Sequence, residues 1–312
     1  MTKLDAPAGE QRLEGYLNRI GKVLGRDDRR ASFAIYALGI LGDGERKSVE
    51  PIAARACADP ARTDAVHQRL LHFMVDSQWS DRAVRREAAS YALEALSARE
   101  SVEAWIIDDT GFLKQGAHSV GVQRQYTGSA GKIANCQIGT SLTVATQTEQ
   151  IPIDFALYLP KSWLDDDKRR EEARIPWDLQ FATKPELGLQ LIRRALDDHV
   201  PPGIILADAA YGASEEFRDG IRDMGLHYAV GIEAPMKVMV YDKRGHRRDE
   251  KISVKQLALR IESRGGFRRT TWRHGTRGPL SARFAVRRVV WAGKLHKNAG
   301  AIERREPYMA LD

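Results

Sequence analysis

The 312-residue sequence lacks the features that mark membrane, secreted and zinc-binding proteins. It has no run of about 18 apolar residues, which a membrane-spanning helix needs, and its first residues form no apolar core like that of a secretory signal. It contains only two cysteines, Cys57 and Cys136, which lie far apart and lack CxxC or Cys/His spacing. We therefore expect a cytoplasmic protein with two buried free thiols and no membrane association.

The charge balance is basic, with 49 Lys and Arg against 42 Asp and Glu and a formal net charge of +7. Lys and Arg neutralise phosphates and release counter-ions, so this excess suits a polyanionic partner. Charge alone does not establish that partner. The hydrophobic content of 43% is typical of a folded chain rather than a disordered one.

The first third of the chain has the periodicity of helices. In YLNRIGKVLG and FAIYALGIL, apolar residues recur at three- and four-residue spacing, and similar segments follow the basic turn at 42–47. Ser48, Thr63 and Ser80 stand where helix starts are expected. We predict a helical N-terminal domain at 1–99. Its role stays open between DNA binding and a dimerisation or scaffold bundle.

After this domain the pattern changes to strands mixed with helices. VEAWIIDD, CQIGTSLTVAT and IPIDFALYLP are typical of strands in an antiparallel meander. A predicted helix, KPELGLQLIRRALDDHV, follows, and then the strand IILA, the helix EEFRDGIRDMG and the strand LHYAVGI. This order predicts an α/β fold at 100–235, with a mixed sheet that resembles the ribonuclease-H arrangement. Residues 236–312 are basic and predicted to be β-rich, with MKVMVYD and KISVKQLA as strands around a charged turn.

Two carboxylate positions stand out after apolar runs. Asp108 and Asp109 follow Trp105–Ile107, and Asp208 follows IILA, so we expect all three at the C-terminal ends of strands. A carboxylate at a buried strand end is costly unless it is paired, hydrogen-bonded or bound to metal. Two such carboxylates on neighbouring strands could share Mg²⁺ or Mn²⁺ ions, which prefer oxygen ligands. The competing interpretation is a turn residue or a helix N-cap. An aspartic protease would need a second Asp-Thr-Gly or Asp-Ser-Gly copy, and the sequence has none.

Two basic segments could contact DNA. The first is the Gly-rich stretch from Lys114 to Lys132, which lacks P-loop spacing and could equally be a solvated hairpin loop. The second mixes arginine with aromatic residues. Arginine suits phosphates and aromatic rings stack on bases or on arginine, although a solvated sheet face fits as well. Its aromatic members are Trp272, Phe284 and Trp291. The predicted DNA contacts are Lys114, His118, Arg124, Lys132, Arg273, Arg277, Arg287 and Arg288.

Blocks along most of the chain resemble the IS701-type insertion-sequence transposases, a branch of the DDE superfamily. YALGILGDGERKSVEPIA and QRLLHFMVDSQW are similar to the N-terminal region of that family. WIIDDTGFLKQGAHSVGVQRQYTGSAGKIANCQIGTSL and IILADAAYG are similar to its two catalytic aspartate segments. Between them lie LYLPKSWLDD and ATKPELGLQLI, and after them WRHGTRGPLSARFAVRRV is similar to the insertion. Many blocks in one order make the resemblance specific.

The resemblance implies a ribonuclease-H-like domain, a Mg²⁺- or Mn²⁺-dependent site, and a homodimer on double-stranded DNA. The first acid would be Asp109, or Asp108 in a D-x-T alignment, and the second would be Asp208. The third acid of the family is a Glu on a late helix, and no such block is present; Glu303 and Glu306 lie in a different sequence context. We therefore expect a truncated or frameshifted transposase. The alternatives are a non-catalytic DNA-binding remnant and an unrelated hydrolase with an Asp pair.

Overall fold

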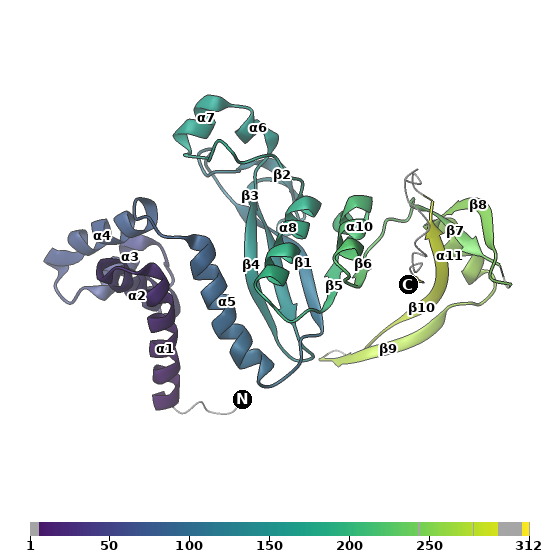
Figure 1. Cartoon of the computed structure of the whole chain (residues 1–312), viewed down its shortest axis with the longest axis horizontal. Coiled ribbons are helices and arrows are strands. Elements are labelled where there is room, and N and C mark those ends of the chain that lie inside the picture. Colours follow the sequence, from purple (N-terminus) through teal and green to yellow (C-terminus); the bar gives the residue numbers. More distant parts are fainter. Residues whose placement is uncertain (1–5, 243, 277, 293–307, 312) are drawn as a thin grey trace. The chain divides into compact units, whose positions relative to one another are not determined.

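The computed structural model describes residues 6–242, 244–276, 278–292 and 308–311. The chain forms two compact units, residues 1–205 and 206–312, and the division falls inside strand β5 (Ile204–Ala207). Figure 1 follows the chain through the first unit, from helices in purple and blue to a sheet in teal. Each unit is described separately below.

The first unit begins with a helical region. Its elements are α1 (Ala6–Leu24), α2 (Asp27–Leu41), α3 (Val49–Ala56), the short 3₁₀ helix η1 (Pro60–Arg62), α4 (Thr63–Val75) and α5 (Asp81–Ser97). Ser80 caps α5, because its side chain accepts a hydrogen bond from the backbone of Ala83. Two small apolar clusters hold the helices together, one around Ile20, Leu24 and Phe73 and the other around Ile52, Ala53 and Leu70.

An antiparallel sheet follows the helices. Strand β3 (Lys132–Ala145) pairs through its residues 136–145 with the whole of β1 (Ala104–Leu113). It also pairs with β2 (Gln123–Thr127) and with β4 (Gln150–Tyr158). Strand β5 adjoins β1, because the backbone N–H of Ile204 donates to the carbonyl of Glu103 over 2.9 Å. The strand order in this unit is therefore β2-β3-β1-β5, with β4 beside β3.

One face of this sheet is covered by α8 (Lys184–Asp197), which packs on β3 and β4. The buried side chains of β3 alternate with half-exposed ones, as expected when one face meets a helix; the buried set is Cys136, Ile138, Thr140, Leu142 and Val144. The short helices α6 (Lys161–Leu164) and α7 (Asp167–Glu172) connect β4 to α8 and pack around the buried Trp163.

The opposite face of the sheet carries exposed apolar side chains. By strand register they lie on the side of β3 that faces away from its buried set. They are Phe112, Tyr126, Ile133, Phe155 and Leu157. Within the described residues, these large side chains have no helix packed over them to bury them.

A charged cluster joins the helical region to the sheet. The Asp154 side chain on β4 is only 6% exposed and meets Arg194 of α8 at 2.8 Å, Arg85 of α5, and Arg82 of α5 at 3.8 Å. Arg82 also pairs with Asp198 at 2.6 Å. Because α5 and α8 both contribute arginines to one buried carboxylate, the position of the helical region on the sheet is set partly by charge.

The second unit contains α9 (Ala209–Gly212), α10 (Glu215–Asp223) and β6 (Tyr228–Val230), and then a second sheet. Its strands are β7 (Lys237–Tyr241), β8 (Arg247–Ser253), β9 (Arg268–Gly275), β10 (Gly278–Trp291) and β11 (Tyr308–Leu311). Helix α11 (Val254–Glu262) packs against this sheet around a core of Val238, Ile252, Val254, Leu257, Ile261, Ala285 and Val289.

The predicted fold class is confirmed: a helical N-terminal region precedes a mixed α/β arrangement, and β1, β3 and β4 form the predicted meander. The prediction that KISVKQLA is a strand is wrong in its second half. Ser253 and Gln256 form a reciprocal capping box, so the chain turns into α11 directly after β8. The free-thiol prediction holds, but only Cys136 is buried and Cys57 is half-buried.

Candidate active-site residues

Asp108 and Asp109 lie in the middle of β1, and the prediction that they end the strand is wrong. The ladder continues through Thr110–Leu113, which pair with Gly139–Cys136 of β3. Gly111 is necessary here, because a Cβ at this position would lie 1.8 Å from Thr127 Oγ1. The hydroxyl of Ser129 donates to the carbonyl of Gly111 over 2.8 Å. The β2–β3 turn thus packs against β1 just beyond the carboxylates.

Asp109 points to the face of β1 that also carries the buried Trp105 and Ile107. Its side chain is 21% exposed. The hydroxyl of Thr140, its partner on β3, donates to Asp109 Oδ1 over 3.1 Å. On the other oxygen, Lys184 Nζ lies 2.7 Å from Oδ2. The contacts of this partly buried carboxylate thus include a hydroxyl group and an ammonium group.

Helix capping places Lys184 at this site. Thr183 accepts a hydrogen bond from the backbone of Glu186, and the Glu186 side chain accepts one from the backbone of Thr183. Pro185 stands in the first turn, where it fits a helix start. Because α8 begins at a fixed residue, the Lys184 ammonium is directed to Asp109, and it also lies 5.8 Å from the centre of the Tyr158 ring.

Asp108 faces the other side of β1 and is exposed. Its Oδ1 accepts a hydrogen bond of 2.7 Å from the backbone N–H of Asp109. The side-chain parity of the strand therefore separates the two neighbouring aspartates. Of the pair, Asp109 is the one on the face covered by α8.

Asp208 follows β5 as predicted and caps α9. Its Oδ1 accepts hydrogen bonds from the backbone of Ala210 (2.9 Å) and Tyr211 (3.3 Å). Gly212 at the end of α9 lies so close to β6 that a Cβ would stand 1.8 Å from the carbonyl oxygen of Gly231. The helix-cap interpretation therefore accounts for Oδ1 of Asp208, because both of these hydrogen bonds go to that oxygen.

Thr140 and Lys184 both contact Asp109, and neither was predicted from the sequence to be a site residue. The TKPE start of α8 was the available signal, since a capping box marks where a helix begins. Asp208 belongs to the other unit. Among the described residues, no group of three or more His, Cys, Asp or Glu side chains is arranged to hold a metal ion. Asp109 nevertheless suits a cation, because an ammonium group already stands on its Oδ2.

Side-chain hydrogen bonds hold parts of the basic loop between β1 and β3. It contains β2, with Arg124 exposed on that strand and Lys132 exposed at the start of β3. The Asn135 side chain donates to the carbonyls of Lys114 and Gly116, which fixes the start of the loop. Arg169 of α7 donates to the carbonyl of Ala117. The predicted residues Lys114 and His118 are exposed here.

The arginine-rich hairpin β9–β10 has two unlike faces. Side chains alternate between the two faces of a strand. Ala285 and Val289 of β10 point into the core of the second unit, so Arg287 lies on the same inner face and Arg288 on the outer face. Arg273 pairs with Leu280 and so lies on the outer face as well. Trp272 is 57% exposed and packs edge to face on Phe284. The predicted Arg277 lies outside the described residues.

In the arginine-rich segment, the ring of Trp291 meets an arginine, which is one of the two stacking partners expected for its aromatic residues. This ring packs against the core of the second unit, with the Arg218 guanidinium 4.6 Å from the ring centre. Arg218 is itself buried and donates to the carbonyl of Gly212. Burial lowers the pKa of Arg218. The two side chains therefore support the position of α9, next to Asp208.

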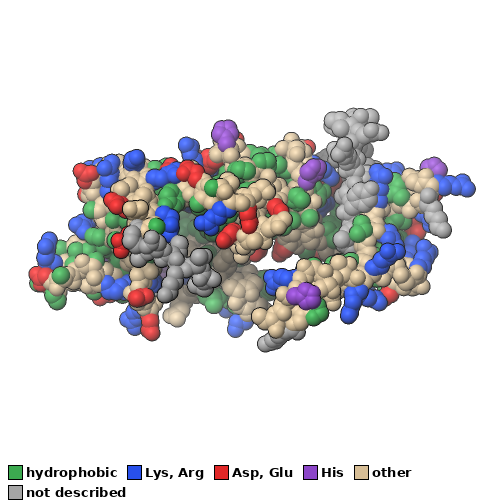
Figure 2. Space-filling view, turned by 90° about the horizontal axis from the view of Figure 1, so that it is seen from below, with side chains coloured by type: hydrophobic (Ala, Val, Ile, Leu, Met, Phe, Trp, Pro, Cys, Tyr) green, Lys and Arg blue, Asp and Glu red, His purple; other side chains and the backbone are tan. Residues whose placement is uncertain are grey.

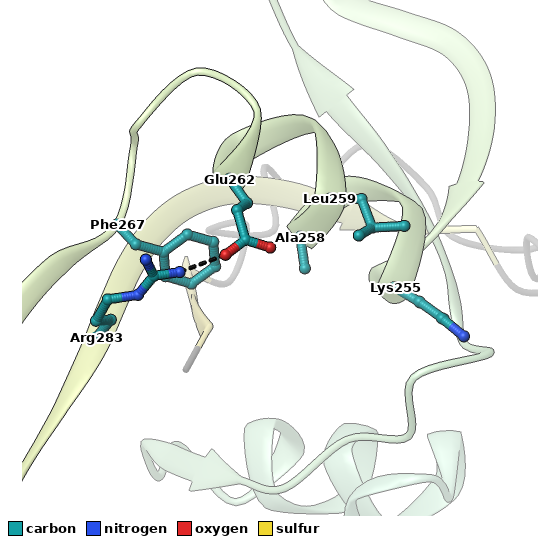
Figure 3. A pocket seen from close by; sticks show the side chains of 6 residues that line it. All are labelled: Lys255, Ala258, Leu259, Glu262, Phe267 and Arg283. Atoms are coloured by element: carbon teal, nitrogen blue, oxygen red, sulfur yellow. Dashed lines mark hydrogen bonds and ion pairs between the residues drawn. The ribbon is translucent and has the colours of Figure 1, made fainter.

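A shallow hollow of about 170 Å³ in the second unit involves none of the predicted site residues. Figure 3 shows it beside α11, where Arg283 reaches Glu262 across the ring of Phe267. Figure 2 shows Lys and Arg side chains at many points on the surface of both units, with Asp and Glu mixed among them over the first. No helix in the described part of the chain is both long and apolar enough to span a bilayer.

Comparisons with known proteins find both a matching family model and a similar protein. A protein-family model described as DDE superfamily endonuclease matches residues 19–279. The chain is also similar to the probable transposase for insertion sequence element IS701 of Microchaete diplosiphon, with 28% identity over 204 residues. That match covers 65% of this chain and 49% of the relative, so the chain spans about half the length of that protein.

Proposed function

This chain belongs to the DDE superfamily of endonucleases, and on that premise we propose that it is an IS701-type transposase that cuts and joins DNA strands. The observation that carries the proposal is Asp109, held on the helix-covered face of β1 by Thr140 and Lys184. In the proposed reaction, water attacks a phosphorus atom at the element end and the 3′-oxygen leaves as a hydroxyl group. That 3′-hydroxyl then attacks a phosphate of the target DNA and displaces a target 3′-oxygen.

Endonucleases of this superfamily use divalent metal ions, and we propose Asp109 and Asp208 as the residues that hold Mg²⁺ or Mn²⁺. Bound metal would activate the attacking oxygen and stabilise the leaving one. The donor chemistry supports this choice, since both groups are carboxylates that follow apolar strand residues. We propose Asp109 rather than Asp108 as the first acid, because Asp108 points away from the face covered by α8.

The chain's own residues would prepare this site. Thr140 fixes Asp109 Oδ1 through a hydrogen bond from a neighbouring strand, and strands hold side chains more rigidly than loops. Asp208 is oriented by two backbone N–H groups that bind its Oδ1. Both carboxylates would therefore keep their orientation before metal and DNA arrive, which lowers the cost of assembling the site.

For DNA contact we propose the basic loop of the first unit and the outer face of the hairpin β9–β10. On that face Arg273 and Arg288 accompany the exposed Trp272, so phosphate contacts and stacking could operate together. Lys114, His118, Arg124 and Lys132 would contribute from the loop. Arg287, on the inner face, would contribute less than its neighbour Arg288.

Three broader features complete the proposal. We propose three functional parts, a helical domain at 1–99, a ribonuclease-H-like core at 100–235 and a β-rich basic insertion at 236–312. We also propose that the protein acts as a homodimer on the terminal inverted repeats of its element and on target DNA. Its place of action would be the cytoplasm.

The test is nicking of a supercoiled plasmid that carries both ends of the element encoding this chain. Wild-type protein with Mg²⁺ or Mn²⁺ should nick at the ends, and Asp109→Asn and Asp208→Asn should each abolish nicking. Asp108→Asn is the matched control on β1 and should keep most of the activity. If Asp208→Asn nicks as well as wild type, the proposed active site is wrong.

A second candidate function is DNA binding without cleavage. It is favoured by the outer face of the hairpin β9–β10, where Arg273 and Trp272 are exposed; Glu303 and Glu306, which were weighed from the sequence as a third acid, lie outside the described residues. This function predicts salt-sensitive binding to element ends and no nicking under any metal condition. Arg273→Gln should then weaken binding, whereas Arg283→Gln, on the inner face and paired with Glu262, should change it little.

A further inference from the structure

The ammonium group of Lys184 contacts Asp109 Oδ2, a carboxylate oxygen that it would have to leave before a metal ion could bind there. Its Nζ lies 2.7 Å from Asp109 Oδ2, at the distance of a charge-assisted hydrogen bond. The lysine comes from the first turn of α8 and the aspartate from the middle of β1. Both side chains are partly buried, at 30% and 21% exposure, so solvent screens the pair less than it screens a surface pair.

The other oxygen of Asp109 accepts from a neutral group. Thr140 donates a single hydroxyl to Oδ1, and a hydroxyl group can rotate to suit a new arrangement. Lys184 differs because it brings a full positive charge. A divalent cation on the same carboxylate would repel that charge, and the repulsion grows as water leaves the site.

We propose that Lys184 is the resident counter-ion of Asp109, and that metal binding displaces its ammonium group from Oδ2. This inference rests on the proposed function, in which Asp109 holds the metal. Lys184 is then a positioning residue: it keeps the carboxylate oriented before metal arrives and competes with metal for one oxygen.

Displacement has a second consequence for the lysine. The helix start is fixed by the capping box, but the four-carbon side chain beyond it is flexible. Once released from Oδ2, the ammonium group carries an uncompensated charge beside the proposed reaction centre. A DNA phosphate is the acidic group that the proposed substrate would bring to that place.

The first experiment measures Lys184 directly in the wild-type protein. The protein is treated with an acetylating reagent at constant pH, with and without Mg²⁺, and each lysine is followed by mass spectrometry. An amine held in an ion pair acylates slowly, so we expect Mg²⁺ to raise the acetylation rate of Lys184 several-fold. Lys168 is the internal control, since its exposed pair with Glu172 at 3.9 Å should not respond.

The second experiment measures metal affinity by Mn²⁺ titration with electron paramagnetic resonance. Lys184→Met removes the competing charge and should bind Mn²⁺ about tenfold more tightly than wild type. Lys184→Arg keeps the charge and should restore the wild-type affinity. Lys168→Met is the matched control and should leave the affinity unchanged. If a variant does not fold, the acetylation experiment still decides the question, because it uses unaltered protein.

The outcomes separate this inference from the proposed function. The inference is overturned if wild type binds Mn²⁺ but Mg²⁺ leaves the acetylation rate of Lys184 unchanged. It is also overturned if Lys184→Met binds Mn²⁺ more weakly than wild type. Either result leaves the transposase proposal standing. A protein that nicks no DNA but shows the Mg²⁺-dependent release of Lys184 fails the proposed function and supports the inference. If wild type and Lys184→Met both bind no Mn²⁺, both proposals fail.

Discussion

Replacing Asp154 should weaken the packing of the helical region against the sheet. Its carboxylate is 6% exposed and is the shared partner of Arg82, Arg85 and Arg194. Asp154→Asn keeps the shape of the side chain but removes the negative charge, so guanidinium groups from α5 and α8 would face one another without it. The variant should remain folded at room temperature and unfold earlier on heating.

The magnitude follows from burial. Removing one partner of a fully buried ion pair costs about 3–5 kcal/mol. Here the three arginines are between 27% and 34% exposed, so water compensates part of the loss. Arg82 also keeps Asp198, and Arg85 keeps Asp81. We therefore expect Asp154→Asn to lower the free energy of unfolding by roughly 2–3 kcal/mol. For a unit of this size, that lowers the melting temperature by about 4–12 °C.

The assay is thermal unfolding by circular dichroism, together with limited proteolysis of the segment at 98–103 between α5 and β1. Asp154→Asn should melt earlier and be cleaved faster in this segment. Asp28→Asn is the control, because it removes the carboxylate of an exposed ion pair with Arg26 and should leave the melting temperature almost unchanged. A variant at Asp154 with the wild-type melting temperature would refute the argument that this carboxylate holds the two helices to the sheet.

Three further predictions concern single sites. Gly212→Ala would bring a Cβ to 1.8 Å from the carbonyl oxygen of Gly231, so α9 must shift. Urea unfolding should then show a free energy of unfolding lower by roughly 1–3 kcal/mol, and an unchanged urea midpoint would contradict this. Thr183→Ala removes the capping box of α8 and should cost about 1 kcal/mol in the same assay, against no loss for Thr183→Ser. Burial raises the pKa of the Cys136 thiol, so at pH 8 iodoacetamide should label Cys57 and spare Cys136. Equal labelling of both thiols would contradict the burial of Cys136. Because the raised pKa favours the protonated thiol in the folded state, the contribution of Cys136 to the free energy of unfolding should fall as pH rises past the ordinary thiol pKa.

Much of the topology could be predicted from the sequence, because each strand has a clear hydrophobic pattern. The three strands of the meander and the helix α8 lie where their periodicity placed them. Which of Asp108 and Asp109 lies on the buried face of β1 was also within reach of the sequence. Alternation along a strand puts residue 109 on the same face as Trp105 and Ile107, and that face is buried.

Other features depend on contacts between distant segments. The pairing of Lys184 with Asp109 joins residues 75 positions apart, and no local pattern marks which lysine meets which carboxylate. The burial of Trp291 likewise depends on packing in the second unit, which a pattern of arginines and aromatics does not reveal. Helix α11 was not predicted for a different reason. The Ser253–Gln256 pair is a recognisable capping box, but the sequence around it has the composition of strands, and the strand prediction was preferred.

The apolar side chains on the open face of the first sheet affect how the protein behaves in a test tube. Phe112, Tyr126, Ile133, Phe155 and Leu157 form a surface that water wets poorly, and two such surfaces reduce their free energy by meeting. Purified at high concentration, the protein should therefore lose monodispersity before it loses secondary structure. A mild detergent or a low protein concentration would keep the particles single, and these conditions suit the binding and cleavage experiments.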